Sequence, residues 1–366
     1  MLKRWMMVIA LVFVLGMVGL GSPTQALQGQ GGALEQMLGQ VPDNAVSRTL
    51  IWYGSAGDLE RILGVQFNNL QDFQKLPPQQ QAAYSLDLGN QVYTSSFSGL
   101  DNWANWQKTF AIDPFAIDRE LTVGTKPNWY AILSGKFAAD TITQALQQLG
   151  YKTAQVGQAT VYSLGGDNTV DQNSVAAKLS GGQYNRLVVT DSVIVAAPST
   201  AMIQAATSGK ALVSDAAYAA LVRVLEGANT VPNTQLLSAA LFNGQFLTDR
   251  LLNNVPAPGQ PLPRYQTAGL GFRRDANNRY WVIALVYANA NDANQAQAEL
   301  TQRLAGYASL TWQPGRKLFE GWKLTPKVTP AANGGLQVVT VSMQLPAQTD
   351  MSWIELVLDR DLGFLK

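Results

Sequence analysis

The sequence contains neither cysteine nor histidine. Without cysteine the chain can form no disulfide, thiol nucleophile, iron–sulfur cluster or thiolate zinc site, so its stability must come from packing. Without histidine it also lacks the commonest general base and the commonest ligand of transition metals. We therefore expect no metal, no cofactor and no catalytic residues that depend on these side chains.

Charged residues are scarce as well, at 14% of the chain, against about 25% in ordinary soluble proteins. Glutamine and asparagine take their place in stretches such as LPPQQQ at 76–81 and NANDANQAQ at 289–297. The 26 basic residues nearly balance the 25 acidic ones. A balanced charge produces no long-range attraction to nucleic acid or to an anionic membrane, so we expect neither as a partner.

The N-terminus is the one strongly apolar stretch. Lys3 and Arg4 precede an apolar run at 5–20, and Thr24, Gln25 and Ala26 follow it. This layout is typical of a secretory signal peptide at 1–26, which places the start of the mature chain at Leu27. The run is long for a signal core and short for a membrane span, so an uncleaved anchor is the alternative. We expect an extracytoplasmic protein, periplasmic, secreted or membrane-tethered, that meets a membrane only through an uncleaved N-terminal segment.

Glycine and proline divide the rest of the chain. Residues 27–44 mix Gly and Gln around a short apolar stretch, which indicates a tether. Residues 253–266 contain four prolines, which exclude this stretch from helix and sheet interiors and indicate an extended connector. The sequence therefore predicts an N-terminal α+β domain at 45–252 and a C-terminal α+β domain at 267–366. Within the first, we expect a strand at 48–54, a helix at 55–64 and a loop at 71–81.

Two distant stretches share one pattern. Residues 128–151 and 279–307 each contain an aromatic-led apolar run, a small polar loop, an amphipathic helix and then Gly-Tyr. The apolar runs have no alternation, so we expect strands that are buried on both faces. For the first helix we expect Asp140 as the N-cap and Gly150 as the stop. For the second we expect Asn291 or Asp292 as the cap and Gly306 as the stop.

The parallel continues downstream of both helices. We interpret residues 129–208 and 280–358 as two copies of one β-α-β-β-α unit, with hairpin turns at 190–192 and 333–335. The predicted fold class is α+β, with two related β-α-β-β-α modules whose antiparallel sheets are covered by helices. Chance α+β alternation is the alternative interpretation. If the duplication holds, the groove where the modules meet is the expected site for a ligand or partner.

Three short motifs carry a family resemblance. Ile112-Asp113-Pro114 starts a helix or turn, Gly135-Lys136-Phe137 follows a strand, and Gly150-Tyr151 ends a helix. Over the first two thirds of the chain this arrangement resembles a loose class of secreted bacterial envelope proteins. The resemblance implies a location outside the cytoplasm and does not imply any particular activity.

Carboxylates are the catalytic groups that remain when cysteine and histidine are absent. Glycoside hydrolysis needs only two of them, and the candidates are Asp113, Asp118, Glu120 and Glu320. Asp113 is better explained as a cap, and the next two as a solvated face. The polar stretch GGDNTVDQNS at 165–174 contains Asp167 and Asp171, but it lacks the calcium-loop register and is interpreted as a loop.

Aromatic residues provide the last candidate site. Trp103 and Trp106 stand three positions apart, with Phe110 four further on, a spacing that places them on one helical face. The simpler interpretation is that all three belong to the core. The alternative is that Trp103 and Trp106 form a ligand-binding platform for sugar rings or a contact for a partner.

Taken together, these features favour a non-catalytic exported protein that binds or scaffolds something in the cell envelope, with an envelope protein or glycan as the partner. A carboxylate-dependent hydrolase acting on envelope polysaccharide is the alternative.

Overall fold

The computed structural model describes residues 32–66, 69–88, 100–171, 173–227, 230–311, 313–332, 335–346, 349 and 352–366. Residues 31–366 belong to one compact unit. The predicted signal peptide and the first residues of the predicted tether therefore lie outside the described residues.

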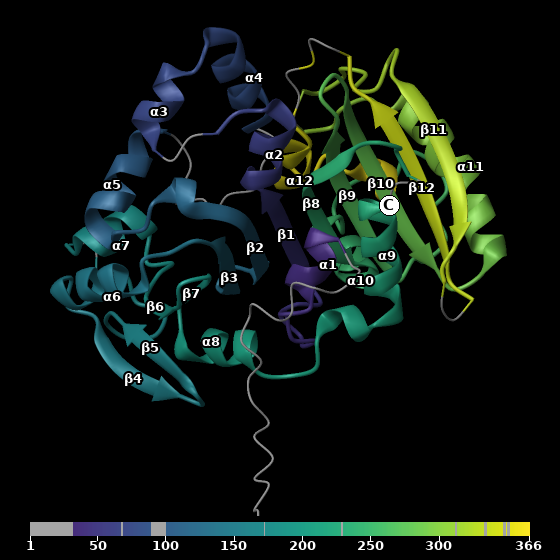
Figure 1. The fold of residues 1–366 in the computed structure, drawn as a ribbon. Coiled ribbons are helices and arrows are strands. Elements are labelled where there is room, and N and C mark those ends of the chain that lie inside the picture. Colours follow the sequence, from purple (N-terminus) through teal and green to yellow (C-terminus); the bar gives the residue numbers. More distant parts are fainter. Residues whose placement is uncertain are drawn as a thin grey trace, which may run out of the picture. The chain divides into compact units, whose positions relative to one another are not determined.

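A twelve-stranded antiparallel sheet runs through the compact unit (Figure 1). Its strand order is β11-β12-β10-β9-β8-β1-β2-β3-β7-β6-β5-β4. The strands are β1 (Leu50–Ser55), β2 (Ile117–Thr125), β3 (Asn128–Gly135), β4 (Lys152–Val156), β5 (Ala159–Ser163), β6 (Arg186–Val189), β7 (Val193–Ala197), β8 (Gln235–Asn243), β9 (Thr267–Arg274), β10 (Arg279–Tyr287), β11 (Lys323–Pro330) and β12 (Gln337–Gln344).

Helices lie on both faces of this sheet (Figure 1). They are α1 (Ala33–Leu38), α2 (Ala56–Leu63), α3 (Leu70–Lys75), α4 (Pro78–Leu88), α5 (Leu100–Phe110), α6 (Ala139–Gln148), α7 (Val175–Ser180), α8 (Thr200–Thr207), α9 (Ala216–Glu226), α10 (Gly244–Phe246), α11 (Ala290–Gly306) and α12 (Trp353–Leu358). The chain is therefore α+β, as predicted.

Strand alternation places two hydrophobic cores on opposite faces of the sheet. In β10, Trp281, Ile283 and Leu285 belong to the core that α11 and α12 share, whereas Val282 and Ala284 belong to the core under α9. This explains why β10 is apolar at consecutive positions, and β3 is buried in the same way from Trp129 to Leu133. The prediction that both runs are buried on both faces is confirmed.

The sheet is one continuous structure, where two sheets were expected. Its two halves are joined where β1 pairs antiparallel with β8. The predicted connector at 253–266 contains neither strand nor helix, but it links β8 to β9, and these two strands are hydrogen-bonded neighbours. Backbone hydrogen bonding therefore crosses the position where the sequence places a domain boundary.

The strand orders of the two halves can be compared directly. β2-β3-β7-β6 on one side and β9-β10-β12-β11 on the other are built in the same chain order, with a helix, α6 or α11, after the second strand. β6 and β7 pair antiparallel around 190–192, as expected for the first hairpin, and β11 and β12 also pair antiparallel. The first half contains in addition the β4–β5 hairpin and α7. Of the second expected turn, Asn333 and Gly334 lie outside the described residues.

Two helix starts differ from the sequence prediction by two or three residues. Asn289 caps α11 by accepting a hydrogen bond from the Asp292 amide, and Ala138 precedes α6 without a side-chain cap, so Asp140, Asn291 and Asp292 lie inside their helices. Both expected stops are at the right place. Gly150 follows α6 with φ of +89°, whereas Gly306 is the last residue of α11.

The predicted loop at 71–81 is wrong, because most of it is helical. Asn69 caps α3 by accepting a hydrogen bond from the Asp72 amide. Pro78 is the first residue of α4, where a missing N–H costs nothing because that position has no intrahelical acceptor. The glutamines that follow are good helix formers. The two prolines therefore separate two helices and do not mark a long loop.

Candidate functional site

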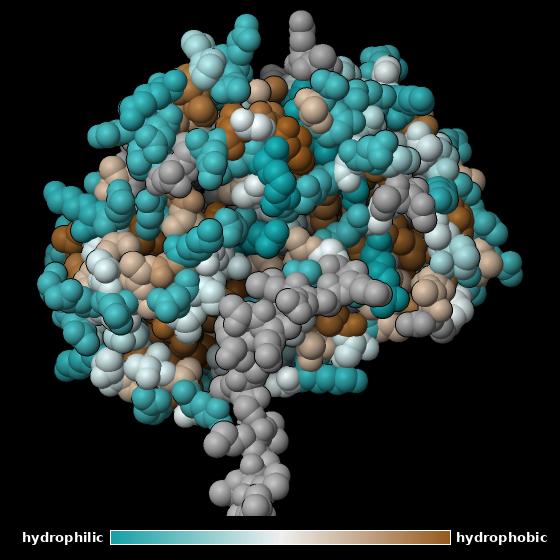
Figure 2. Space-filling view, in the orientation of Figure 1, coloured by the Kyte–Doolittle hydropathy of each residue, from teal (hydrophilic) through white to brown (hydrophobic). Residues whose placement is uncertain are grey.

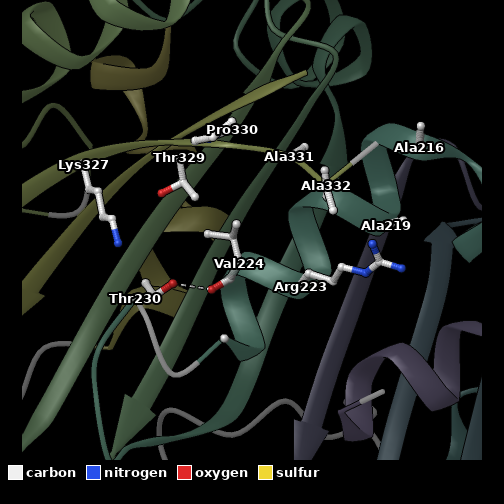
Figure 3. A pocket seen from close by; sticks show the side chains of 12 residues that line it. Ala216, Ala219, Arg223, Val224, Thr230, Lys327, Thr329, Pro330, Ala331 and Ala332 are labelled. Atoms are coloured by element: carbon white, nitrogen blue, oxygen red, sulfur yellow. Dashed lines mark hydrogen bonds between the residues drawn. The ribbon is translucent and has the colours of Figure 1, made fainter. Parts of the chain in front are cut away.

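A groove lies between helix α9 and edge strand β11 (Figure 3). Its volume is about 190 Å³. Its lining residues are Ala216, Ala219, Ala220, Arg223, Val224, Gly227, Thr230, Lys327, Thr329, Pro330, Ala331 and Ala332. We call it the α9–β11 groove. It lies between the two predicted domain ranges, since α9 belongs to 45–252 and β11 to 267–366.

Helix α9 forms one wall of the groove. One face of the helix packs against the sheet, and the face toward the groove carries mostly small side chains. Asp215 caps it by accepting hydrogen bonds from the amides of Ala217 and Tyr218. Leu221 and Leu225 are fully buried against the sheet, where Gly269 of β9 leaves room for them. A Cβ at Gly269 would lie 2.8 Å from Leu225 and 3.1 Å from Leu221. The Gly-Leu-Gly of β9 therefore serves the packing of α9.

The opposite wall is the C-terminal part of edge strand β11. Its Leu324 and Val328 pack against the core shared with α11, whereas Lys327 and Thr329 line the groove. Pro326 and Pro330 stand in the same strand, and proline blocks further strand pairing at a sheet edge. Strand β11 therefore has fewer backbone donors for a partner strand, and its side chains are the main contacts it offers.

Polar groups are few and lie around an apolar centre. The Thr230 hydroxyl donates to the Val224 carbonyl at 2.5 Å, which closes one end of the groove (Figure 3). Arg223, whose side chain is 49% exposed, forms an ion pair of 3.7 Å with Glu35 of α1. The second cation is Lys327, and none of the described lining residues is acidic. Small apolar side chains, two hydroxyls and two positive charges thus make up the site.

Two charged side chains, Glu226 and Arg273, anchor the end of α9 next to the groove. Glu226 accepts hydrogen bonds from the amides of Leu34 and Glu35 at 2.6 and 3.1 Å, which holds the start of α1. Burial raises the pKa of Glu226 above its ordinary value, although these two hydrogen bonds oppose the shift. Burial also lowers the pKa of Arg273 to about 10, and its guanidinium donates to the Leu225 and Thr234 carbonyls. These contacts fix α9 and α1 together.

Trp106, one of the two predicted ligand-binding residues, is core. It is 0% exposed, stacks on Phe110 with ring centroids 4.7 Å apart and meets the edge of Tyr184 at 4.8 Å. A side chain enclosed in this way has no face left for a sugar ring, so the platform interpretation does not hold at Trp106. Trp103 lies in α5, but its side chain is outside the described residues.

The four predicted carboxylates do not converge on one site. Asp113 accepts a hydrogen bond from the Phe115 amide and caps a single 3-10 turn, and burial raises its pKa. Glu120 is buried and accepts from the Thr122 hydroxyl at 3.1 Å, whereas Glu320 is exposed and lies 3.7 Å from Lys317. Asp118 is exposed at the start of β2.

An acid that the sequence analysis did not single out lies near Asp118. Glu60 of α2 has a pKa of about 7, raised first by burial and then by the negative charge of Asp118. The same end of the sheet holds Asp58, which is 1% exposed, accepts from the Ser55 hydroxyl at 2.6 Å and lies 2.7 Å from Arg61. Nothing in the local sequence marks Glu60, because its pKa depends on a strand more than fifty residues away.

The polar stretch at 165–174 has a structural role. Asp167 lies 2.6 Å from Arg186 and accepts hydrogen bonds from the Thr200 amide and hydroxyl, which ties this stretch to the start of α8. In the described part of the chain, no group of three or more acidic side chains is placed to hold a metal ion.

The surface is hydrophilic over most of the face in Figure 2, with hydrophobic residues in separate patches. Among the described residues the large exposed hydrophobics are Leu86, Val170, Val175, Leu310 and Leu358. Isolated apolar residues of this kind are ordinary on protein surfaces. Each described helix is too short or too polar to cross a membrane.

No family model matches the chain, and no curated protein matches it. Among solved structures, the chain is similar to crystal form I of TP0453, with a TM-score of 0.37 and 10% sequence identity over 90% of this chain and 96% of that chain. Crystal form III of TP0453 gives a TM-score of 0.35 at 10% identity, over 89% and 97% of the two chains.

Proposed function

We propose that the protein is a non-catalytic exported binding or scaffolding protein of the cell envelope, and that the α9–β11 groove receives a side chain of a partner protein. The observation that carries the proposal is the composition of the groove. An apolar hollow rimmed by a few polar groups is the usual seat of an anchoring side chain at an interface. The N-terminal segment at 1–26 supports the location, because its layout is typical of an exported chain.

The size of the groove fits a single anchor. A volume of about 190 Å³ equals that of roughly six water molecules at about 30 Å³ each, which suits one large side chain better than a whole cofactor. Ala216 is exposed and Ala219 half-buried, so an incoming group reaches the hollow without displacing the core. Arg223 and Lys327 favour acidic residues around that anchor, since charge complementarity guides partner choice.

Site-specific photo-crosslinking tests this proposal in intact envelopes. A photoreactive residue in place of Ala216 should form a covalent adduct with one envelope protein. The same residue in place of Ala201, which is exposed on α8 outside the groove, is the matched control and should give no such adduct. Equal labelling at both positions, or none at either, would contradict a partner in the groove.

The finer architecture belongs to the same proposal. We infer that residues 129–208 and 280–358 descend from one β-α-β-β-α module, with β4, β5 and α7 inserted in the first copy. The shared chain order of β2-β3-β7-β6 and β9-β10-β12-β11 supports this. Superposition of 129–150 on 280–306 tests it, and a mismatch in strand direction would reject the duplication.

A carboxylate-dependent hydrolase remains the second candidate, and one observation favours it. Glu60 has a pKa of about 7, raised first by burial and then by the negative charge of Asp118, and a carboxyl group that keeps a proton near neutral pH beside a second carboxylate is the pairing that glycoside hydrolysis uses. Release of reducing sugar from envelope polysaccharide decides between the two. Activity that is lost in Glu60→Gln and in Asp118→Asn, but kept in Glu320→Gln, would favour the hydrolase.

A further inference from the structure

A second hollow lies at the opposite end of α9 from Glu226, around its N-cap. Its volume is about 290 Å³, near the lower limit of about 300 Å³ for small-molecule pockets. It is lined by polar side chains from four separate segments, among them Arg48, Asp215, Asn243, Gln245 and Gln266. We infer that this hollow, the α9 N-cap pocket, binds a neutral polyhydroxylated ligand, a sugar.

The charge of the pocket excludes ions as its preferred ligand. Arg48 donates to both carboxylate oxygens of Asp43, at 2.6 and 2.8 Å, and to Asp215 at 2.8 Å. Its positive charge is therefore already neutralised, which removes the attraction for an anion. The two carboxylates leave one negative charge over. Arg48 engages both of them, and Asp215 also accepts hydrogen bonds from the Ala217 and Tyr218 amides at the positive end of α9, so a cation gains little from them. A neutral ligand remains.

The free hydrogen-bonding groups match hydroxyls. In the described part of the chain, the Arg48 Nη1, the Asn243 Nδ2 and the side-chain amides of Gln245 and Gln266 make no hydrogen bond. A side-chain amide offers donors and an acceptor together, and a hydroxyl both donates and accepts. Several neighbouring hydroxyls on one ring satisfy such a set, whereas an apolar or purely anionic molecule does not.

Backbone hydrogen bonds hold the segments that carry these side chains in place before a ligand binds. The Gly244 amide donates to the Gln266 carbonyl at 2.8 Å, the Gln266 amide donates to the Val286 carbonyl at 2.8 Å, and the Asn243 amide donates to the Thr49 carbonyl at 3.3 Å. Gly244 is needed for this contact, because a Cβ there would lie 2.0 Å from the Tyr265 carbonyl oxygen. Because the backbone is already fixed, binding has to order only the side chains, which lowers the entropic cost.

The walls add a limited apolar surface. Tyr265 lines the pocket while its hydroxyl donates to the Leu365 carbonyl at 2.9 Å, so its ring is fixed. The buried Ala217 and Thr267 also line the pocket. Tyr265 is only 7% exposed, so these residues form a small apolar floor and do not present a ring face to a sugar.

Saturation-transfer NMR on the full chain tests the inference, with glucose, galactose, mannose and N-acetylglucosamine as probes. At least one of these neutral sugars should receive saturation. The double variant Gln245→Leu/Gln266→Leu should bind it roughly tenfold more weakly, because two amides are lost. Both side chains are exposed and their backbone contacts are unchanged, so the variant should keep the unfolding midpoint of the unmodified protein.

The matched control is Gln204→Leu, on the exposed side of α8, which should bind the sugar as the unmodified protein does. Absence of saturation transfer to all four sugars overturns the inference. So does equal binding by the double variant, or tighter binding of glucuronate or inorganic phosphate than of any neutral sugar.

Discussion

At the scale of single residues, Glu60 links structure to a measurable pH dependence. Its pKa rises from an ordinary 4.5 to about 7 in the folded chain. Between these pH values Glu60 holds a proton in the folded state and has lost it in the unfolded state. The free energy of unfolding therefore falls as pH rises through this window, and above pH 7 the folded protein bears the full destabilisation.

We therefore predict that Glu60→Gln raises the free energy of unfolding relative to the unmodified protein at pH 8 and that this advantage disappears below about pH 4. Urea unfolding at several pH values measures the difference. In an Asp118→Asn background the stability gain from Glu60→Gln should be smaller, because the charge of Asp118 contributes to the raised pKa of Glu60. A Glu60→Gln variant whose stability runs parallel to that of the unmodified protein at every pH would falsify the assignment.

The tryptophan pair gives a second residue-scale prediction. Trp106→Ala should lower the free energy of unfolding by roughly 3–5 kcal/mol, since it empties a fully enclosed position. The result for Trp103→Ala distinguishes the two interpretations of that residue. A loss of several kcal/mol indicates core, and a change within about 0.5 kcal/mol indicates an exposed ring that remains available to a ligand. Chemical denaturation of each variant measures both.

The sequence identifies residues by chemical type, and that limits what it can find. Trp103 and Trp106 stand out because aromatic residues often bind ligands, yet helical spacing alone does not say which side of α5 faces the core. The groove is built mostly from alanines and threonines, with a valine, a glycine, a proline and two basic residues. No local sequence pattern marks these residues. They form a site only because the fold places β11 beside α9, about a hundred residues earlier in the chain.

At the scale of helices and strands, the two glycine stops look alike in the sequence and differ in the structure. Gly150 adopts a φ of +89° after α6, whereas Gly306 closes α11 without a left-handed conformation. A Cβ added at either glycine would meet no atom within 4 Å, so only backbone conformation distinguishes them. We predict that Gly150→Ala costs about 1 kcal/mol and that Gly306→Ala is neutral or stabilises by up to about 1 kcal/mol.

Thermal unfolding of the two single variants measures this contrast, and each serves as the control for the other. Equal effects in the two variants would show that the ends of α6 and α11 are equivalent after all. The comparison needs no knowledge of the ligand, because both glycines lie outside the α9–β11 groove and the α9 N-cap pocket.

Periodicity identifies the long elements well, and turn-forming residues identify the short ones poorly. The stripe of α11 and the buried runs of β3 and β10 are predictable because apolar spacing reports burial directly. Residues 71–81 are not, since prolines that flank a helix and prolines that interrupt a loop look the same locally. The pairing of β1 with β8 has no local signal, because the two strands are about 180 residues apart.

At the scale of the whole molecule, the continuous sheet implies shared stability. Because β8 pairs with β1 on one side and β9 on the other, neither predicted domain can lose its structure without exposing a strand of the other. We predict one cooperative unfolding transition for residues 31–366. Calorimetry checks it through the ratio of calorimetric to van't Hoff enthalpy. Two separable transitions would contradict this prediction and support the domain boundary expected at 253–266.

The seam between β1 and β8 also has a consequence for how the chain folds. Either half can assemble its own strands first, and each then ends in a bare strand, β1 or β8, that is buried along almost its whole length in the finished protein. An apolar strand with open backbone groups is the usual starting point of aggregation between chains. The finished sheet ends instead at β11, which contains two prolines, and at the short, exposed β4. Pairing β1 with β8 therefore buries two apolar strand edges and leaves only the edges at β11 and β4, which pair poorly with other chains. The chain is most prone to aggregate before this pairing forms.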